Sequence, residues 1–340
     1  MWYSVQNLTQ QSQQIQWINY LKGIGIVLVV AGHVYTNFLS PLIFSFHMPL
    51  FFFIGGYLLS VKDPKEFLIS KANHLLIPYL SFIIIFIALW TYTFYTRNQL
   101  SPAVFTKLIT DSLLGGKHLA GWQGVFWFVT VFFVSQQILN FICYKTSNNQ
   151  VIFSIMVASL TLSYLNQTYL PLLSFPLGIN IVLFALPIMY MGKVYRETRF
   201  NLPWWFILLA SIAIIYFYHT DFSKMKIDLK YTKYGIPVIS LFIALIFIEL
   251  LILFSKDVGH FLGSILKPLS SASMMIMFTH QYFHFKLMEY GLKNETLIFI
   301  FSLLLSFGCY LLVIRSSKAS LLLIGVKRNS AQCTENNYNE

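Results

Sequence analysis

The sequence predicts an all-α integral membrane protein, a single bundle of about ten transmembrane helices with both termini on the cytoplasmic side. The first observation is composition: the 340 residues are 57% hydrophobic and 18% aromatic, and only 10% are charged. Soluble domains carry about 25% charged residues, so this balance excludes a soluble globular protein. The second observation is that apolar runs recur along nearly the whole chain. With spans of about 20 residues, the length accommodates roughly ten helices.

We expect one membrane domain at residues 17–315, between a polar, Gln-rich segment at 1–16 and a polar tail at 316–340. The N-terminus lacks the charged region and small-residue cleavage site of a signal peptide, so the first span should stay in the mature protein. The predicted spans are the apolar runs at 18–38, 41–60, 76–96, 122–144, 151–168, 178–194, 203–219, 236–254, 268–288 and 296–314.

The distribution of basic residues predicts the orientation. If the N-terminus is cytoplasmic, the inner segments hold fourteen and the outer loops nine of the 23 Lys and Arg residues. The excess of positive charge inside favours an N-in, C-in protein of the cell inner (plasma) membrane. The net charge of +11 is scattered between apolar runs, which indicates contact with lipid headgroups and argues against nucleic acid as a partner. The three cysteines are far apart and give neither a disulfide framework nor metal-ligand spacing.

The first two predicted spans, residues 19–60, carry the densest set of ionisable groups. Their sequence predicts two apolar helices joined by a tight turn at Ser40–Pro41. Lys22 and His33 are eleven positions apart, which returns to nearly the same helix face roughly 16 Å further along. His47 lies on the second helix at a depth similar to His33. A single such histidine is most simply a buried residue bonded to a carbonyl, but the three groups together indicate a functional site because intramembrane charges are costly.

Two further segments contribute candidates. The segment between the second and third spans predicts a short amphipathic helix on the inner membrane surface, on which Lys71 and His74 share a face. Snorkelling toward the headgroups is the alternative interpretation for both. Trp127 lies near the start of the fourth span and belongs either to the site or to the interfacial aromatic belt.

The ninth span brings a third histidine to the same depth. His280 and His284 are four residues apart and lie on one helix face, so we expect His33, His47 and His280 to converge in the outer half of the membrane. Histidine pairs at this spacing suit zinc, but no carboxylate or thiol joins them at ligand spacing, and we expect no metal. A general base or an orienting donor fits better because imidazole titrates near neutral pH.

Glu249 is the carboxylate deepest within an apolar run. It is expected to neutralise Lys22 or Lys71, or else to carry protons in a transporter. The sequence contains no Walker loop, dinucleotide fingerprint, HExxH or GxSxG motif, so ATP hydrolysis, dinucleotide chemistry and serine hydrolysis lack support.

Several motifs resemble the integral membrane acyltransferases of acyltransferase family 3, in the branch of fucose 4-O-acetylase-like and polysaccharide O-acyltransferase proteins. These motifs are Lys22-x10-His33, SFHMPLFFFIGGYL at 45–58, LLIPY at 75–79, VFWF at 125–128 and SMMIMFTH at 273–280. They extend over the first four spans and the ninth. The resemblance implies an acyltransferase-like transmembrane domain over residues 17–315.

The resemblance implies transfer of an acyl group, usually acetyl from acetyl-CoA, to a hydroxyl of a cell-envelope or exported glycan. It implies that His33 is the central catalytic residue, acting as the base on the acceptor hydroxyl, and His47 would orient it, donate to the oxyanion or carry the acyl group. Lys22, Lys71, His74, Trp127 and His280 are the expected supporting or acyl-donor-binding residues. The acceptor stays open among capsule, O-antigen, exopolysaccharide and glycolipid, as does a non-acetyl group such as succinyl.

This chain departs from the family pattern at two places. Lys22 replaces the arginine of the motif normally written Arg-x10-His, which keeps the charge but loses planar bidentate pairing. Lys71 and His74 stand where the family often carries Arg-x-x-Arg, so a site for the phosphates of coenzyme A would hold less fixed charge.

Two other function classes compete with the acyltransferase. A transporter or flippase of a lipid-linked sugar or small solute would use Glu249 and the histidines as relay or substrate groups, although no inverted repeat is visible. A non-catalytic scaffold in an envelope-polysaccharide complex is the third hypothesis.

Overall fold

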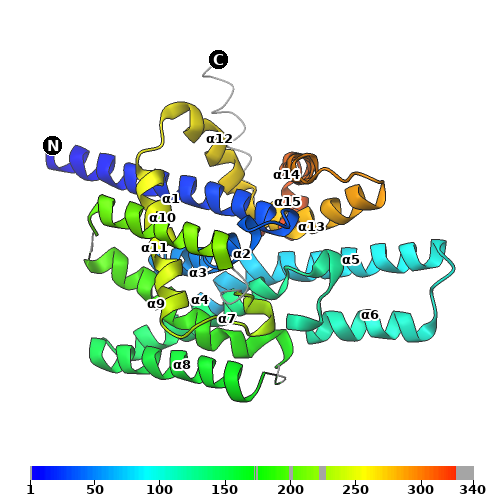
Figure 1. Ribbon diagram of the computed structural model, residues 1–340, viewed down its shortest axis with the longest axis horizontal. Helices are drawn as coiled ribbons and strands as arrows, with labels where there is room; N and C mark the ends of the chain where they lie inside the picture. Colours follow the sequence, from blue (N-terminus) through cyan, green and yellow to red (C-terminus); the bar gives the residue numbers. More distant parts are fainter. Residues whose placement is uncertain (1, 172, 174, 199–201, 222–226, 327–340) are drawn as a thin grey trace.

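The computed structural model describes the whole chain except residues 1, 172, 174, 199–201, 222–226 and 327–340. Within the described part, the regular elements are all helices, and the extended pairing is confined to an isolated bridge between Asp228 and Lys233. The predicted all-α class is therefore confirmed (Figure 1).

The helices follow one another along the chain in this order. The first half of the chain forms α1 (Trp2–Val34), α2 (Leu39–Phe44), α3 (His47–Tyr57), α4 (Pro64–Lys71), the π-helical turn η1 (Ala72–Leu76), α5 (Ile77–Thr96), α6 (Pro102–Leu114), the 3₁₀ turns η2 (Gly116–His118) and η3 (Gly121–Gln123), α7 (Trp127–Lys145) and α8 (Asn149–Tyr169). The second half forms η4 (Pro176–Ile181), α9 (Val182–Thr198), α10 (Trp204–Asp221), η6 (Leu229–Tyr231), α11 (Ile239–Lys256), α12 (His260–Ser271), α13 (Ser273–Glu289), α14 (Glu295–Val313) and α15 (Ser317–Ile324).

The described residues contain eight helical segments that are long and apolar enough to cross a membrane. A ninth is the pair α12 and α13 if that pair, bent by 79°, forms one span. The helix at Trp204–His219 is shorter but also apolar. Each of the ten predicted apolar runs coincides with one of these segments, so the protein is a multi-pass membrane protein by length and composition.

The second span differs from the expected single helix. The chain turns between Val34 and Leu39, and Ser40–Pro41 lie within the first turn of α2 instead of forming the turn. Pro41 fits there because the first N–H groups of a helix have no intrahelical partner. A break at Ser45–Phe46 then separates α2 from α3, so His47 becomes the first residue of α3.

The amphipathic segment after the second span is also different from the prediction. Asp63 caps α4 by accepting bonds from the backbone N–H groups of Lys65 and Glu66. The helix continues through η1 into α5, so Pro64–Thr96 is one 33-residue candidate span and not a separate surface helix. A π turn inserts an extra residue and rotates the helix face, which changes which side chains lie together.

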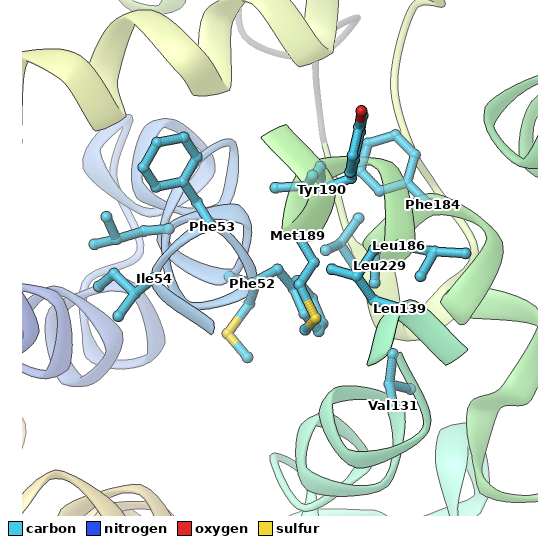
Figure 2. Packing of buried hydrophobic residues seen from close by; sticks show 14 of the residues in the cluster. Phe52, Phe53, Ile54, Val131, Leu139, Phe184, Leu186, Met189, Tyr190 and Leu229 are labelled. Atoms are coloured by element: carbon cyan, nitrogen blue, oxygen red, sulfur yellow. The ribbon is translucent and has the colours of Figure 1, made fainter. Parts of the chain in front are cut away.

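Glycines allow the helices around the site to touch backbone to backbone. A Cβ on Gly56 of α3 would lie 1.6 Å from the carbonyl oxygen of Met189 on α9. A Cβ on Gly192 of α9 would lie 2.0 Å from the carbonyl oxygen of Phe53 on α3. Small residues at such crossings are typical of membrane helix pairs. Figure 2 shows the buried cluster at this crossing, where side chains of α3, α7 and α9 meet Leu229 of η6.

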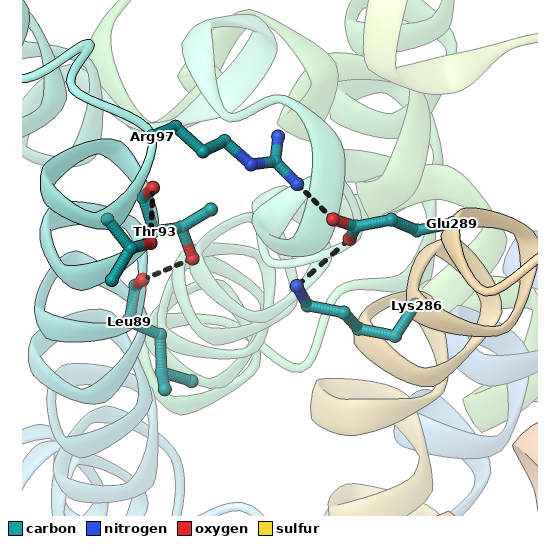
Figure 3. Close-up of polar contacts among 6 residues, drawn as sticks. Leu89, Thr93, Arg97, Lys286 and Glu289 are labelled. Carbon is teal, nitrogen blue, oxygen red and sulfur yellow. Dashed lines mark hydrogen bonds and ion pairs between the residues drawn. The ribbon is translucent and has the colours of Figure 1, made fainter.

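An exposed ion-pair network joins the C-terminal ends of α5 and α13. Glu289 accepts hydrogen bonds from Arg97, which directly follows α5, and from Lys286, whose Nζ lies 2.9 Å from the carboxylate (Figure 3). Lys286 also lies over the ring of Trp122, 5.2 Å from its centroid. These contacts keep α13, which carries His280, next to α5 and η3.

Candidate functional site

A cavity of about 530 Å³ lies inside the bundle. Its walls come from α1, the α2–α3 pair, α7, α13, the segment around η1 and the loop that contains η6. The ionisable residues that line it are Lys22, His33, His47, Lys71, Asp228, Lys230 and Tyr231. The remaining lining is mostly apolar, as in most ligand sites, where a few polar groups fix a ligand's orientation.

The two predicted lysines share one region of this cavity. Lys22 projects from α1, and Lys71 projects from the last position of α4, directly before the π turn. A Cβ on the neighbouring Gly23 would lie 2.4 Å from the Leu266 carbonyl oxygen, so α12 fixes α1 at the level of Lys22. The Lys71 ammonium lies 5.3 Å from the centre of the Phe67 ring. The structure thus brings together two cations that are 49 positions apart in the sequence.

The three predicted histidines also meet. The ring centroid of His33 is 5.4 Å from that of His280 and 6.3 Å from that of His47. His47 and His280 are buried, at 1% and 0% exposure, whereas His33 is half-buried and lines the cavity. Phe44 packs edge-on against His33 and His47 with centroid distances of 5.1 and 4.9 Å. His33 is therefore the central member of the cluster.

Backbone hydrogen bonds fix the tautomers of the two flanking histidines. Nδ1 of His47 lies 2.8 Å from the Ile43 carbonyl oxygen, and Nδ1 of His280 lies 2.8 Å from that of Ile276. A carbonyl can only accept, so Nδ1 carries the proton and donates in both rings. In the neutral imidazole Nε2 is then an acceptor. Nε2 of His280 is buried and has no hydrogen-bond partner among the described residues.

Trp127 is the first residue of α7 and lines the cavity beside Phe128. Its side chain is 6% exposed, so it forms part of the cavity wall within the protein. Gln136 and Gln281 line the same cavity and were not singled out by the sequence. Glutamines in apolar helices carry no pattern that marks them before their neighbours are known.

His74 does not join the other candidates. It lies within η1, is exposed, and does not line the cavity, whereas Lys71 and Leu75 do. The π turn separates the faces of Lys71 and His74, which an α-helix would have placed together. The backbone of His74 instead contacts Gly325 after α15, since a Cβ on Gly325 would lie 2.4 Å from the His74 carbonyl oxygen.

Lys230 is a cavity residue that the sequence did not identify. It lies on η6, within a loop described from the sequence only as mixed in charge, and nothing local separates it from Lys233. Its Nζ donates to the Leu119 carbonyl oxygen at 2.5 Å and lies 5.3 Å from the centre of the Tyr231 ring. Burial lowers the pKa of the Lys230 ammonium to about 8, and the Asp228 carboxylate opposes part of that shift.

Within the described part of the chain, Glu249 forms no ion pair with Lys22 or Lys71, and it does not line the cavity. Its side chain is 8% exposed and accepts a hydrogen bond of 3.1 Å from the Tyr195 hydroxyl on α9. Glu249 is therefore part of the α9–α11 contact. The described residues also contain no group of three or more His, Cys, Asp or Glu arranged to hold a metal ion.

Together, the helix bundle and an internal, mostly apolar cavity lined by His33 and His47 define a membrane protein with a reaction or binding chamber. Residues 15–315 match the family described as an acyltransferase domain, and the chain belongs to this family, acyltransferase family 3. It is 30% identical over 216 residues to Nodulation protein NolL of Mesorhizobium japonicum. That alignment covers 57% of this chain and about half, 53%, of the relative. No solved structure matches the chain. The resemblance found in the sequence is thus confirmed at the level of the family.

Proposed function

We propose that the protein is a membrane O-acyltransferase that moves an acetyl group from acetyl-CoA to a hydroxyl of a cell-envelope or exported glycan. The observation that supports the proposal is the shared cavity, which is lined by His33, by Lys22 and Lys71, and by the loop that contains η6. Membership of an acyltransferase family supports the reaction class. Capsule, O-antigen, exopolysaccharide and glycolipid are the acceptor classes considered.

Lys22 and Lys71 are the proposed contacts for the phosphates of the acyl donor. Hydrogen bonds from an ammonium to a phosphate are charge-assisted and stronger than neutral ones. His33 lies eleven residues along α1 from Lys22, roughly 16 Å by the rise of a helix. This separation fits a donor whose phosphates lie away from its thioester, so the thioester would reach the histidines while the phosphates stay at the lysines.

His33 is proposed as the general base. It takes the proton of the acceptor hydroxyl while the hydroxyl oxygen attacks the thioester carbonyl carbon. The carbon–sulfur bond then breaks, and the proton passes to the departing coenzyme A sulfur, which yields the ester and free coenzyme A. His47 and His280 hold their Nδ1 protons on backbone carbonyls. In the proposal their Nε2 atoms orient His33 or receive its proton, while Trp127 helps to exclude water.

The proposed orientation places the lysines at the cytoplasmic side of the inner membrane and the η6 loop at the outer side. Such an arrangement suits a phosphate-rich donor that arrives from the cytoplasm and a glycan acceptor beyond the membrane. The excess of basic residues in the inner segments supports this orientation.

The test is acetyl transfer by the purified full-length protein. Radiolabelled acetyl-CoA is incubated with a glycan and glycolipid extract of cells that lack the gene, and label in the extract is counted. We expect label with the wild type and with His260→Ala, an exposed histidine outside the cavity, but not with His33→Ala. No label with the wild type would contradict the proposal, and uptake of solute by proteoliposomes without acetyl-CoA would favour a transporter.

A further inference from the structure

We infer that Asp228, Lys230 and Tyr231 form the subsite that holds the acceptor, and that they recognise an uncharged, hydroxyl-rich sugar unit. This inference rests on the proposed function and adds to it the residues and the chemistry of acceptor binding. All three residues line the same cavity as His33, although they lie on the loop between α10 and α11.

Residues 227–233 of this loop are held against the bundle by backbone hydrogen bonds and buried side chains. The backbones of Asp228 and Lys233 pair in an antiparallel bridge with N···O distances of 2.9 and 3.0 Å. Ile227 and Leu229 are buried at 2% and 3% exposure, and Leu229 belongs to the core cluster shown in Figure 2. Lys230 is fixed to the segment between η2 and η3 through the Leu119 carbonyl. A site on a fixed loop can orient a ligand, because its side chains lose little freedom on binding.

The chemistry of the three side chains matches a sugar. A carboxylate such as that of Asp228 accepts hydrogen bonds. The Lys230 ammonium has three N–H groups, and one of them donates to the Leu119 carbonyl oxygen. A sugar hydroxyl both donates and accepts, so a carboxylate beside an ammonium can bind neighbouring hydroxyls. Among the described loop residues that line this part of the cavity, Lys230 and Asp228 contribute one positive and one negative charge, which suits an uncharged acceptor. Tyr231 is 50% exposed and offers an aromatic surface.

The cavity wall beside Lys230 contains two glycines. Gly121 and Gly124, at and after η3, line the cavity without side chains. A Cβ on Gly124 would lie 3.7 Å from Nζ of Lys230, so a side chain at this position would contact the ammonium. Gly121 also has a φ of +55°, a backbone conformation that disfavours other residues.

The experiment measures initial rates with the full-length protein, acetyl-CoA and the extract of cells that lack the gene. The variants are Lys230→Met, Asp228→Asn and, as a matched control, Lys233→Met, because Lys233 is exposed on the same loop and does not line the cavity. We expect Lys230→Met and Asp228→Asn to raise the KM for the acceptor roughly tenfold, because each variant loses a hydrogen bond to a charged group. The KM for acetyl-CoA should stay unchanged. The control should match the wild type in both constants.

Two further readouts separate ligand binding from a structural role. The acceptor KM of the wild type should rise with pH through about 8 as the Lys230 ammonium loses its proton, and Lys230→Met should not show this rise. The titratable groups that surround Lys230 are Asp228, Tyr231, Lys117 and His118 on η2, and His33 across the cavity. If the acceptor is uncharged, its KM should stay constant between about 50 and about 500 mM salt.

The outcomes are distinguishable. No transfer by the wild type would contradict the proposed acyltransferase and this inference with it. Transfer by the wild type with unchanged acceptor KM in Lys230→Met and Asp228→Asn, or with a rise in the KM for acetyl-CoA alone, would overturn the subsite while leaving the acyltransferase intact. A KM that rises steeply with salt would overturn the assignment of an uncharged acceptor.

Discussion

The rings of His33 and His280 lie 5.4 Å apart, although α1 and α13 place them 247 positions apart in the chain. His280 is buried and bonded through Nδ1 to its own helix, so its position is set before any substrate binds. This fixed neighbour gives His33 a defined electrostatic and steric environment in the cavity.

We therefore expect His280→Ala to act through His33. Removing a group that orients a general base should lower kcat roughly 10- to 100-fold, within the range of general acid–base contributions, while the KM for acetyl-CoA stays constant. The matched control is His260→Ala, because His260 is exposed and does not line the cavity. A selective rise in the KM for acetyl-CoA would argue that His280 shapes the donor site instead.

The two cavity lysines should govern binding of the donor. Lys22→Met and Lys71→Met each remove one charge-assisted contact to phosphate, and we expect the KM for acetyl-CoA to rise roughly tenfold or more. Lys65→Met is the control, since Lys65 is exposed on α4 and does not line the cavity. Equal KM values for acetyl-CoA in all three variants would remove the lysines from the donor site.

The contact between α3 and α9 should be highly sensitive to volume. In Gly56→Ala the added Cβ would fall 1.6 Å from a backbone carbonyl oxygen, so the helices must separate. Overpacking of this kind costs about 1–3 kcal/mol or more, and we expect a clearly lower melting temperature in detergent. Gly308→Ala in α14 is the control, because its Cβ would meet nothing within 4 Å. A Gly56→Ala protein as stable as that control would mean that α3 and α9 are not in backbone contact.

The ionisation of Lys230 links stability to pH. Its pKa of about 8 in the folded protein is below the value of about 10.4 for an unfolded chain. Between these values the unfolded state binds more protons, so stability rises with pH, and the cost of burying the ammonium disappears as it loses its proton. The melting temperature of the wild type relative to Lys230→Met should increase from about pH 8 to about pH 10. A difference that stays constant or decreases would contradict a buried ammonium.

The local sequence predicted the helices and the histidine cluster because hydropathy and helical periodicity determine both. The ten apolar runs coincide with observed helices, and the spacing of Lys22 and His33 places both in the cavity. The convergence of His47 and His280 with His33 was predicted by comparing the depths of the three histidines within their spans. These properties depend on residues close in the sequence, or on the thickness of the membrane.

The features that the sequence did not predict depend on contacts between segments that are distant in the chain. The π turn that separates Lys71 from His74 has no sequence signature, and a regular helix would have placed the two residues on one face. The position of Lys230 depends on Leu119, 111 positions away, whose carbonyl oxygen accepts a hydrogen bond from the ammonium. Glu249 bonds with Tyr195 on a neighbouring helix, a pairing that helix order along the chain does not determine.

The most direct test of the central claim is mass spectrometry of envelope glycans from cells that lack the gene, complemented with the wild type, His33→Ala or His260→Ala. Membrane insertion of each variant is checked by its amount in the membrane fraction. We predict that the wild type and His260→Ala restore a mass increase of one acyl group, whereas His33→Ala is inserted but restores none. Full acylation by inserted His33→Ala would contradict His33 as the base, and identical glycans in all strains would contradict acyl transfer to these glycans.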